Sequence, residues 1–359
     1  MIYKKIIIKI GTNVLTHDDG RLDLEIMRNI VEQIANLKKN GIEIIVVTSG
    51  AVGSGKFLIT LPENLNEVTK KQVYAAIGQP KLMSLYSEFF MKYDLICAQI
   101  LATKMDFCDK THFNNMKSCF EGVFGTNVIS IVNENDTVSV RELMFTDNDE
   151  LAGLLASMMG VDSLIILTNV DGVYNGDPKK PESQVIPEIK YEDIAKLEDF
   201  ISPEKSKFGR GGMLTKSGIA KKLSNLGVTT HIINGKKINS ILKVLNNEII
   251  GTKFIPKKSL SSAKRWVAVA DGYEKGIIYV SKCAEEVLMS KDRVASLLPV
   301  GVIKIDGEFK KGDILKIKNE KNGNLGYGMA QYDSKMAREF MGQKNKKELV
   351  HYDYLYIDV

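Results

Sequence analysis

The sequence predicts an α/β fold, an open and mostly parallel sheet sandwiched by helices, followed by a small, mostly β domain. Over the first 250 residues, short apolar runs alternate with segments of helical period. These runs are apolar throughout, which is typical of strands in a sheet that is covered on both faces. Beyond residue 255 the pattern changes to short strands separated by turn signals, which indicates a separate β unit.

The composition is that of a folded chain of two domains. Hydrophobic residues make up 44% of the 359 residues and charged residues 26%, which excludes the disordered and low-complexity classes. No apolar run approaches the roughly 18 residues that a membrane-spanning helix needs, and the apolar start is broken by Lys9. The four cysteines, Cys97, Cys108, Cys119 and Cys283, have no C-x-x-C spacing. We therefore expect neither a disulfide framework nor a zinc site, and we expect a cytoplasmic location.

The elements of the first part can be assigned in chain order. Residues 6–10 form the first apolar run and are predicted to be a strand. Apolar residues then recur at helical spacing from Leu24 to Leu37, with Asp23 placed to cap the helix and Gly41 to end it. The next strand is expected at 42–48. Later strands are expected at 95–101, 128–132, 164–168 and 230–233, and helices at 149–159 and 214–226.

The second part begins after a segment rich in lysine and serine, which is typical of a linker. We therefore expect a catalytic domain over 1–255, a linker over 256–264 and a β domain over 265–359. Turn signals such as Asp306-Gly307 separate its short strands. These are expected at 266–270, 276–280, 302–305, 314–318 and 354–359.

The run Gly50–Lys56 matches the phosphate-loop pattern G-x-x-x-x-G-K and follows a strand. Phe57 stands where that motif has a hydroxyl for magnesium, so we interpret the match as fortuitous. The turn at 48–51 nevertheless presents backbone N–H groups at a helix start, which suits a carboxylate or a phosphate.

Lys9 is the one charged residue in the apolar run 6–10. A buried lysine is costly unless an anion pairs with it. Because Gly11-Thr12 follows, Lys9 lies at the carboxyl end of its strand, where ligands of such sheets bind. A phosphoryl group is the predicted anion, whereas a solvated lysine on an edge strand is the alternative.

Two acidic and amide clusters lie at a strand end and a helix start. Asn133–Asp136 follows the strand 128–132, and Asp147–Asp149 leads into the helix 149–159. Such groups can hold an α-amino group, Mg²⁺ or a lysine ammonium, although each could also be an ordinary turn or cap.

Gly209–Lys216 is a glycine-rich run that leads into the predicted helix 214–226. Its glycines permit a nest of backbone donors around a polyphosphate, and Lys216 adds a point charge.

These motifs occur together in a fixed order, and the set resembles the amino acid kinase family. The motifs shared with the whole family are Lys9–Thr12, Thr48–Ala51, Leu167–Tyr174 and the glycine run ending at Lys216. Others resemble the glutamate 5-kinase branch of the family; they are Ala76–Gln79, Asn133–Asp136, Asp147–Asp149 and Gly211–Lys216. Ser296–Val302 and Gly307–Asp313 resemble a PUA domain.

The resemblance implies the amino acid kinase fold and a role for each matching residue. Lys9 and Lys216 would contact the transferring phosphoryl group, and Asp149 would orient both lysines. The substrate would be held by Ser49, Asn133, Asp136, Asp147 and Asn148. ATP would be held by Lys9, Thr168, Asn169, Arg210, Gly211, Gly212, Met213, Leu214, Thr215 and Lys216. No metal site on the protein is expected, because Mg²⁺ would arrive with ATP.

The sequence departs from the family pattern at several positions. Asn169 stands where an aspartate is common, and Thr146 replaces a common glycine. Arg210 and Leu214 also differ from the usual residues of the glycine run. None of these changes removes a lysine or a carboxylate that the chemistry needs.

The implied reaction is transfer of a phosphoryl group from Mg·ATP to the γ-carboxylate of L-glutamate, the first step of proline biosynthesis. A carboxylate is a nucleophile at neutral pH, so the scattered histidines are no obstacle. The alternatives are a related kinase that acts on acetylglutamate or aspartate, and a non-catalytic relative, which retention of Lys9, Asp149 and Lys216 disfavours.

The resemblance also implies partners. Proline is expected as a feedback inhibitor, and the chain is expected to form a dimer or tetramer. PUA domains elsewhere bind RNA, but residues 251–359 carry only 20 Lys and Arg against 14 Asp and Glu. They also lack aromatic and basic interleaving in sequence, so we expect neither RNA nor membrane binding.

Overall fold

The structure is a computed structural model that describes residues 2–139, 145, 147–178, 180–194, 212–256, 264, 267, 274–290 and 295–357. The chain divides into two compact units, one of Met1–Asp106 with Asn115–Ser259 and one of Phe107–Asn114 with Leu260–Val359. The predicted boundaries around the linker stay a prediction, since 257–263 lie outside the described residues. Within the described residues, no helix has the length and apolar character that a bilayer crossing requires.

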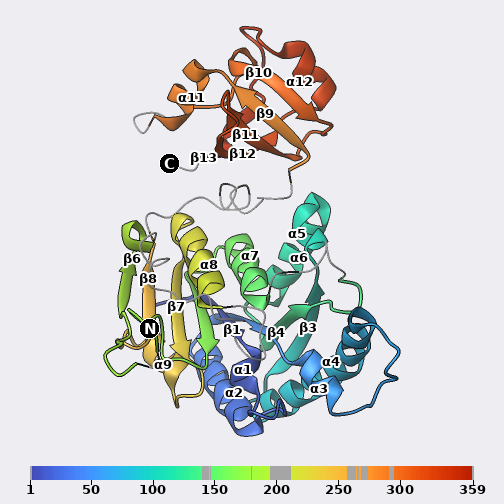
Figure 1. The fold of residues 1–359 in the computed structure, drawn as a ribbon, viewed down its shortest axis with the longest axis vertical. Coiled ribbons are helices and arrows are strands. Elements are labelled where there is room, and N and C mark those ends of the chain that lie inside the picture. Colours follow the sequence, from blue (N-terminus) through green and yellow to red (C-terminus); the bar gives the residue numbers. More distant parts are fainter. Residues whose placement is uncertain are drawn as a thin grey trace. The chain divides into compact units, whose positions relative to one another are not determined.

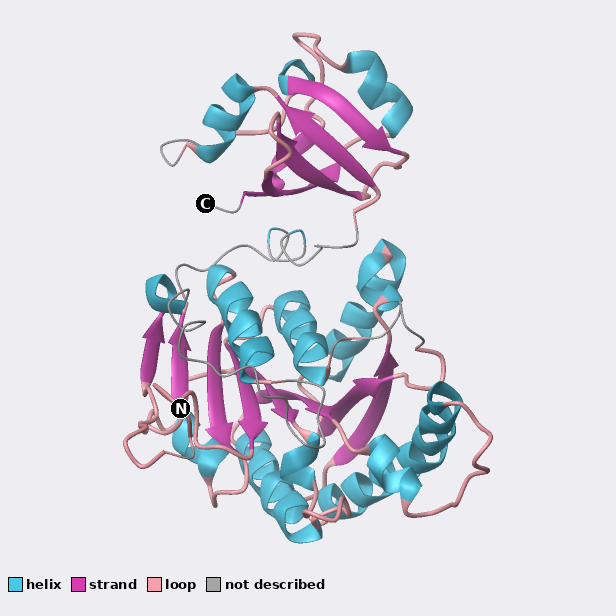
Figure 2. Cartoon of the chain, in the orientation of Figure 1, coloured by secondary structure: helices cyan, strands magenta, loops and turns pink. Residues whose placement is uncertain are grey.

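The larger unit contains an eight-stranded sheet in the order β3-β4-β2-β1-β5-β7-β8-β6 (Figures 1 and 2). Neighbouring described strands pair in parallel, except for the antiparallel pair β7 and β8. This confirms the predicted open, mostly parallel sheet. The strands are β1 (Lys5–Ile10), β2 (Glu43–Thr48), β3 (Ile96–Ala102), β4 (Val128–Glu134), β5 (Ser163–Thr168), β6 (Glu188–Lys190), β7 (Thr229–Asn234) and β8 (Thr252–Ile255).

Helices cover both faces of this sheet. Residues of α2, α4 and α9 join one core cluster on the first face, while α7 packs on β1 and β5 and contacts α8 on the second (Figure 1). The helices are α1 (Thr12–Leu15), α2 (Leu24–Lys39), α3 (Ala51–Lys56), α4 (Glu67–Met91), α5 (Met105–Cys108), α6 (Lys110–Val123), α7 (Asn148–Met159), α8 (Met213–Asn225) and α9 (Ser240–Leu245).

The pleat of β1 directs Lys9 toward the second face. Ile6, Ile8 and Ile10 alternate along the strand and belong to the core cluster with α2 and α4. Successive side chains of a strand point to opposite faces, so Lys9 points toward α7 and α8. Because β1 lies between β2 and β5, Lys9 is on an inner strand and only 5% exposed, which rules out the solvated edge position.

The local signals at α2 act as predicted. The Asp23 side chain accepts hydrogen bonds from the backbone N–H groups of Glu25 and Ile26, which satisfies two donors at the helix start. Gly41 follows the last turn with φ +79°, a conformation that favours glycine. The first predicted helix is therefore confirmed together with its ends.

The expectation of burial on both faces is wrong for the strand predicted at 95–101. It forms β3, which is the edge of the sheet, and the side chain of Ile96 is 58% exposed. The apolar run that suggested an inner strand lies partly in solvent, because no strand among the described residues pairs with the outer side of β3.

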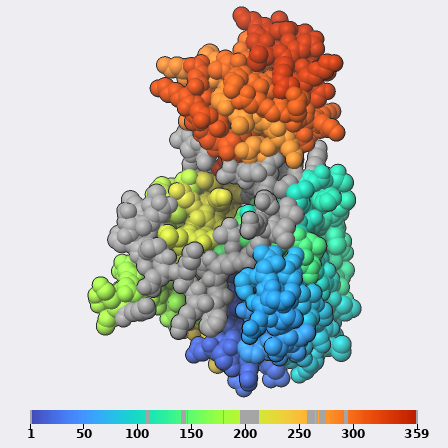
Figure 3. Space-filling model, turned by 45° about the vertical axis from the view of Figure 1, so that its right-hand side comes forward, coloured from blue at the N-terminus to red at the C-terminus, as the bar shows by residue number. Residues whose placement is uncertain are grey.

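Helices α3 and α4 cross at unusually short range. A Cβ on Gly55 would lie 2.0 Å from the backbone oxygen of Tyr74, and one on Gly78 would lie 1.8 Å from that of Ala51. Only glycine permits this approach. The surface that these helices form is light blue in Figure 3. The run Gly50–Lys56, which matches the phosphate-loop pattern, is thus the turn before α3 and α3 itself.

The C-terminal unit is a five-stranded sheet in the order β10-β9-β11-β12-β13 with its own core. Three of the predicted strands are confirmed, and the last one begins four residues earlier than expected. The predicted strand 266–270 lies outside the described residues except for Val267. The elements are β9 (Gly276–Val280), α11 (Lys282–Met289), the 3₁₀ turn Pro299–Gly301, β10 (Val302–Gly307), β11 (Ile314–Asn319), β12 (Asn324–Ala330), α12 (Ser334–Phe340) and β13 (Val350–Ile357).

The sheet of this unit carries basic side chains over aromatic rings. Lys304 lies 4.7 Å from the ring centre of Tyr279, and Lys316 lies 5.4 Å from that of Tyr327. The linear sequence shows no such interleaving, because the members of each pair come from neighbouring strands.

Candidate active site

Two lysines converge on one buried carboxylate at the carboxyl end of β1. The Oδ1 atom of Asp149 lies 2.6 Å from Nζ of Lys9, and Oδ2 accepts a hydrogen bond of 2.9 Å from Nζ of Lys216. Asp149 is fully buried, and the lysines are 5% and 8% exposed. Strand β1 and helices α7 and α8 supply one residue each, so the fold brings together three residues that are far apart in sequence.

The charges of this group shift the carboxyl groups in opposite directions. Burial alone would raise the pKa of Asp149, but the ammonium groups of Lys9 and Lys216 hold it below its usual value. Burial and the negative charge of Asp149 raise the pKa of Asp147. Asp149 is therefore ionised at neutral pH, with one carboxylate between two ammonium groups. The group keeps an excess of positive charge for an anionic ligand.

Asp147 begins the helix that carries Asp149. Its Oδ1 atom accepts hydrogen bonds of 2.9 Å and 3.1 Å from the backbone N–H groups of Asp149 and Glu150. This N-cap fixes the first turn of α7, in which Asn148 and Asp149 lie. The bland interpretation of Asp147 as a cap is thus correct, and its Oδ2 atom has no hydrogen-bond partner.

Asn148 connects the carboxyl ends of two strands. Its Nδ2 donates to the backbone oxygen of Thr48 at 2.8 Å, to Oγ of Ser49 at 3.0 Å and to Oδ1 of Asn133 at 2.9 Å. Asn133 in turn donates to Oε1 of Gln79 on α4 at 2.9 Å. These donations fix the orientation of Asn148, whose Oδ1 atom is left without a partner.

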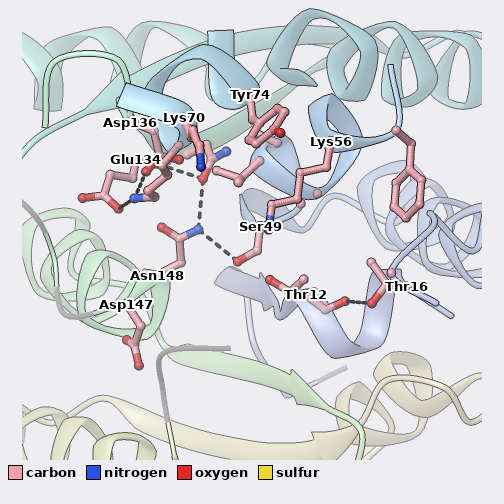
Figure 4. A pocket seen from close by; sticks show the side chains of 18 of the residues that line it. Thr12, Thr16, Ser49, Lys56, Lys70, Tyr74, Glu134, Asp136, Asp147 and Asn148 are labelled. Carbon is pink, nitrogen blue, oxygen red and sulfur yellow. Dashed lines mark hydrogen bonds and ion pairs between the residues drawn. The ribbon is translucent and has the colours of Figure 1, made fainter. Parts of the chain in front are cut away.

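Two adjoining cavities meet at this network. The larger one, of about 640 Å³, is lined by residues of α3, α4 and the ends of β2 and β4 (Figure 4). The smaller one, of about 80 Å³, is lined by Lys9, Asp149 and Lys216. Both are lined by Thr12, Ser49, Asp147 and Asn148.

The wall of the larger cavity contains residues that the sequence did not single out. They are Lys70, Lys71 and Tyr74, which line it from α4. Lys56 of α3, the lysine of the phosphate-loop match, lines it as well. In Figure 4, Lys70, Glu134 and Asp136 gather on one side of Asn148, and Thr12 and Thr16 lie on the other. A polar stripe at helical spacing from Glu67 to Tyr74 is the signal that could have revealed this wall.

Asp136, a predicted substrate residue, is hydrogen-bonded to Lys71, and both line the larger cavity. Asn133, Ser49, Asp147 and Asn148 also line it, so the structure brings all the predicted substrate residues together.

Those predicted nucleotide residues that the structure describes divide into two groups. Thr168 and Asn169 line the smaller cavity with Lys9 and Lys216. Gly212 precedes α8 as its N-cap, and the first turn of α8 contains Met213, Leu214 and Thr215. Arg210, Gly211 and Thr146 lie outside the described residues.

The fold and this site define a phosphotransferase: an α/β sheet in which one lysine from a strand end and one from a helix contact a buried aspartate beside a small cavity. The chain belongs to the amino acid kinase family, which matches residues 4–234. Residues 276–351 match the PUA domain, as the resemblance implied.

Two relatives that match over nearly their whole length are named as glutamate 5-kinases. The chain is 47% identical to a glutamate 5-kinase of Bacteroides thetaiotaomicron over 99% of both chains. It is 46% identical to a glutamate 5-kinase of Chlorobaculum tepidum over 99% of this chain and 98% of the relative.

Solved structures of lower identity share the fold. UMP kinase from Bacillus anthracis has a TM-score of 0.50 at 16% identity, covering 72% of this chain and 98% of that one. Carbamate kinase from Giardia lamblia, bound to AMP-PNP, has a TM-score of 0.53 at 18% identity, covering 71% of this chain and 99% of that one.

Proposed function

We propose that this chain transfers the γ-phosphoryl group of ATP to the γ-carboxylate of L-glutamate, which gives L-glutamyl 5-phosphate, the first step of proline biosynthesis. The observation that carries the proposal is the group Lys9–Asp149–Lys216, which lines the smaller of the two adjoining cavities. The full-length similarity to glutamate 5-kinases supports glutamate as the acceptor.

The chemistry needs position and charge rather than a base. A γ-carboxylate oxygen attacks the γ-phosphorus, the bond to the β-γ bridging oxygen breaks, and ADP leaves. Lys9 and Lys216 offset the charge on the transferring group. Asp149 holds both ammonium groups in place before the substrates arrive, so little reorganisation is needed during the transfer.

The acceptor is expected in the larger cavity. Ser49 and Asn148 also border the smaller cavity, so they are placed to bind the end of the amino acid that is phosphorylated. Asn133 holds Asn148 in its orientation, and Asp136 offers a carboxylate for the α-ammonium group. Asp147 fixes the turn that carries Asn148.

ATP is expected against the smaller cavity, held by Lys9, Thr168, Asn169 and the residues before and within the start of α8. The predicted members of that stretch are Arg210, Gly211, Gly212, Met213, Leu214, Thr215 and Lys216.

Magnesium fits this site as a partner of ATP. Among the described residues there is no group of three or more His, Cys, Asp and Glu side chains that could hold a metal ion alone. The unpartnered buried oxygens of Asn13, Asp147 and Asn148 line the smaller cavity, and such oxygens are the ligands that Mg²⁺ prefers. When bound with ATP, the ion would neutralise phosphate charge.

The test is ATP-dependent formation of γ-glutamyl hydroxamate by the purified protein with Mg²⁺ and hydroxylamine, which traps the acyl phosphate. L-Glutamate, N-acetylglutamate and L-aspartate are compared in parallel. We expect product with glutamate alone. Product with another acid instead would show that the proposed acceptor is wrong and that the proposed reaction class, phosphoryl transfer, is right. No product with any of the three would contradict the proposal.

Two further properties implied by the family are proposed with it. Proline is expected to lower the rate of hydroxamate formation, and the chain is expected to form dimers or tetramers in sedimentation. RNA binding through the PUA domain is the competing role. Salt-dependent retention of the full chain on RNA would support it, and the lysine and tyrosine pairs on β9–β12 are where we would look first.

A further inference from the structure

We infer that Lys71 binds the α-carboxylate of the amino acid substrate, beside the α-ammonium group that Asp136 receives. The inference rests on the proposed function and deepens it, since it adds a specificity-determining residue on α4 to the substrate site. The larger cavity then recognises both charges of a free amino acid.

The pair is built into the cavity wall. Nζ of Lys71 is hydrogen-bonded to Oδ1 of Asp136 and lies 4.0 Å from Oε2 of Glu134. The side chains of Lys71 and Asp136 are only 25% and 10% exposed, and both line the larger cavity. One comes from α4 and the other from the segment after β4, so the fold itself creates the pair.

The neighbouring residues hold the two groups in register. Gln72, next to Lys71, donates a hydrogen bond of 2.8 Å to the backbone oxygen of Thr137, next to Asp136. The close crossing at Gly55 and Gly78 holds α4 against α3. Two successive residues of α4 are thus tied to two successive residues after β4, which makes the pair a prearranged receptor.

The chemistry of the pair matches an α-amino acid. A lysine ammonium has three N–H donors, of which Asp136 takes one, so the others are available for a carboxylate. The carboxylate of Asp136 can likewise accept from an ammonium group. Because the pair is largely shielded from water, such contacts are stronger than at a surface.

The position along the cavity agrees with this role. Ser49 and Asn148 border the smaller cavity with Lys9 and Lys216, whereas Lys71 and Asp136 line the larger cavity and not the smaller one. A glutamate whose γ-carboxylate faces the two catalytic lysines therefore has its α-carbon directed into the larger cavity.

The other two lysines of the cavity fit this role less well. The Lys70 side chain is as shielded as that of Lys71, at 25% exposure, but its partner at 3.1 Å is Glu67, whose side chain is 90% exposed, whereas the partner of Lys71 is the shielded Asp136. Lys56 is an exposed residue. A carboxylate at Lys56 would compete with water. Lys70, adjacent to Lys71 on the same helix and equally exposed, provides a matched control.

The experiment compares Lys71→Met, Lys71→Arg and the control Lys70→Met with the wild type. Each is assayed with L-glutamate and with 4-aminobutyrate, which is glutamate without its α-carboxylate, and kcat/KM is measured for both. We expect Lys71→Met to raise KM for glutamate about 10- to 100-fold with kcat and the KM for ATP nearly unchanged. The preference for glutamate over 4-aminobutyrate should fall by a similar factor, and Lys71→Arg should keep most of it.

The ratio of kcat/KM for glutamate to kcat/KM for 4-aminobutyrate distinguishes a loss of α-carboxylate binding from a general loss of folded enzyme. A Lys71→Met enzyme that loses activity equally with both substrates, or that keeps the wild-type preference, overturns the inference. So does an equal loss of preference in Lys70→Met. If the wild type makes no hydroxamate from glutamate, the proposed function fails first and this inference fails with it.

Discussion

Asp149 and Lys9 face each other across the boundary between α7 and the sheet, with Oδ1 of the carboxylate 2.6 Å from Nζ of the lysine. The other carboxylate oxygen receives Lys216, so one buried residue positions both cations. Neither lysine needs a substrate to be drawn into place. The site is therefore arranged before the substrates bind. Replacement of a lysine and replacement of the aspartate should have different effects.

Replacement of Lys216 by alanine should lower kcat for hydroxamate formation by about 100- to 1000-fold, since it removes a cation that offsets charge in the transition state. The fold should survive, because Asp149 keeps Lys9 as a partner. The matched control is Lys222→Ala, an exposed lysine on the same helix, which should leave kcat unchanged. A Lys216→Ala enzyme with nearly normal kcat would remove this lysine from the catalytic group.

Asp149→Asn should destabilise the protein by about 3–5 kcal/mol at pH 7, because two buried ammonium groups lose their counter-charge. The pKa of Asp149 is lowered on folding, so its contribution is present above the unfolded pKa and is lost as pH falls through the folded pKa. Urea unfolding at pH 7 and pH 3.5 should show the difference from the wild type shrinking at the lower pH. A constant difference would contradict this.

Added pyrophosphate provides a second measurement on the same variant. The anion should raise the unfolding midpoint of Asp149→Asn more than that of the wild type, since it replaces the missing charge beside the lysines. An equal rise in both would indicate that the lysines do not face the anion site.

His231 should make the protein less stable in mild acid. Its ring is buried and accepts or donates a hydrogen bond of 2.8 Å with the Tyr3 hydroxyl, and burial, with the charge of Lys253, lowers its pKa to about 3. Below about pH 6.5 the imidazole of His231 therefore binds a proton in the unfolded chain but not in the folded chain. Between pH 7.5 and pH 5 this costs about 2 kcal/mol of unfolding free energy.

The test for His231 is urea unfolding at both pH values. His231→Gln removes the titrating group and keeps a polar partner for Tyr3, so its acid loss should be about 2 kcal/mol smaller than that of the wild type. His17→Gln, at an exposed ring, is the control and should behave as the wild type does. Parallel pH curves for wild type and His231→Gln would refute the prediction.

Gly78→Ala should destabilise the protein by about 3 kcal/mol and raise KM for the acceptor, because the added methyl would meet the backbone oxygen of Ala51 at 1.8 Å. The two helices must separate, and they form one wall of the larger cavity. Gly122→Ala is the matched control in α6, where a Cβ has open space, and it should stabilise by about 0.5–1 kcal/mol. Thermal unfolding and acceptor KM decide the case; equal effects of the two changes would contradict it.

The framework of the larger unit could be predicted from sequence because its signals are local. Apolar runs marked the inner strands, Asp23 and Gly41 marked a helix, and Lys9 stood out inside an apolar strand. The clusters at 133–136 and 147–149 came together since the carboxyl ends of parallel strands share one edge of the sheet.

Contacts between distant segments could not be predicted in this way. Helix α4 contains Gly78 and Pro80, both of which indicate an interruption in sequence, and yet it runs from Glu67 to Met91. Because α4 was not predicted from the sequence, the pairing of its residue Lys71 with Asp136 could not be predicted either. Strand β12 was missed for a similar reason, since its Gly326 and Gly328 weaken the strand pattern and are explained only by the close approach of β13.

The crossing of α3 and α4 also explains why a familiar signature misleads here. Gly55 keeps no side chain because another helix occupies that space, and Ser54 N–H is already bonded to Gly50 at 2.9 Å within its own turn. Binding of a triphosphate and close packing of two helices can thus produce the same glycine pattern in a sequence. A second glycine on the partner helix, here Gly78, distinguishes the two cases. Its presence indicates that the pattern reflects helix packing and not nucleotide binding.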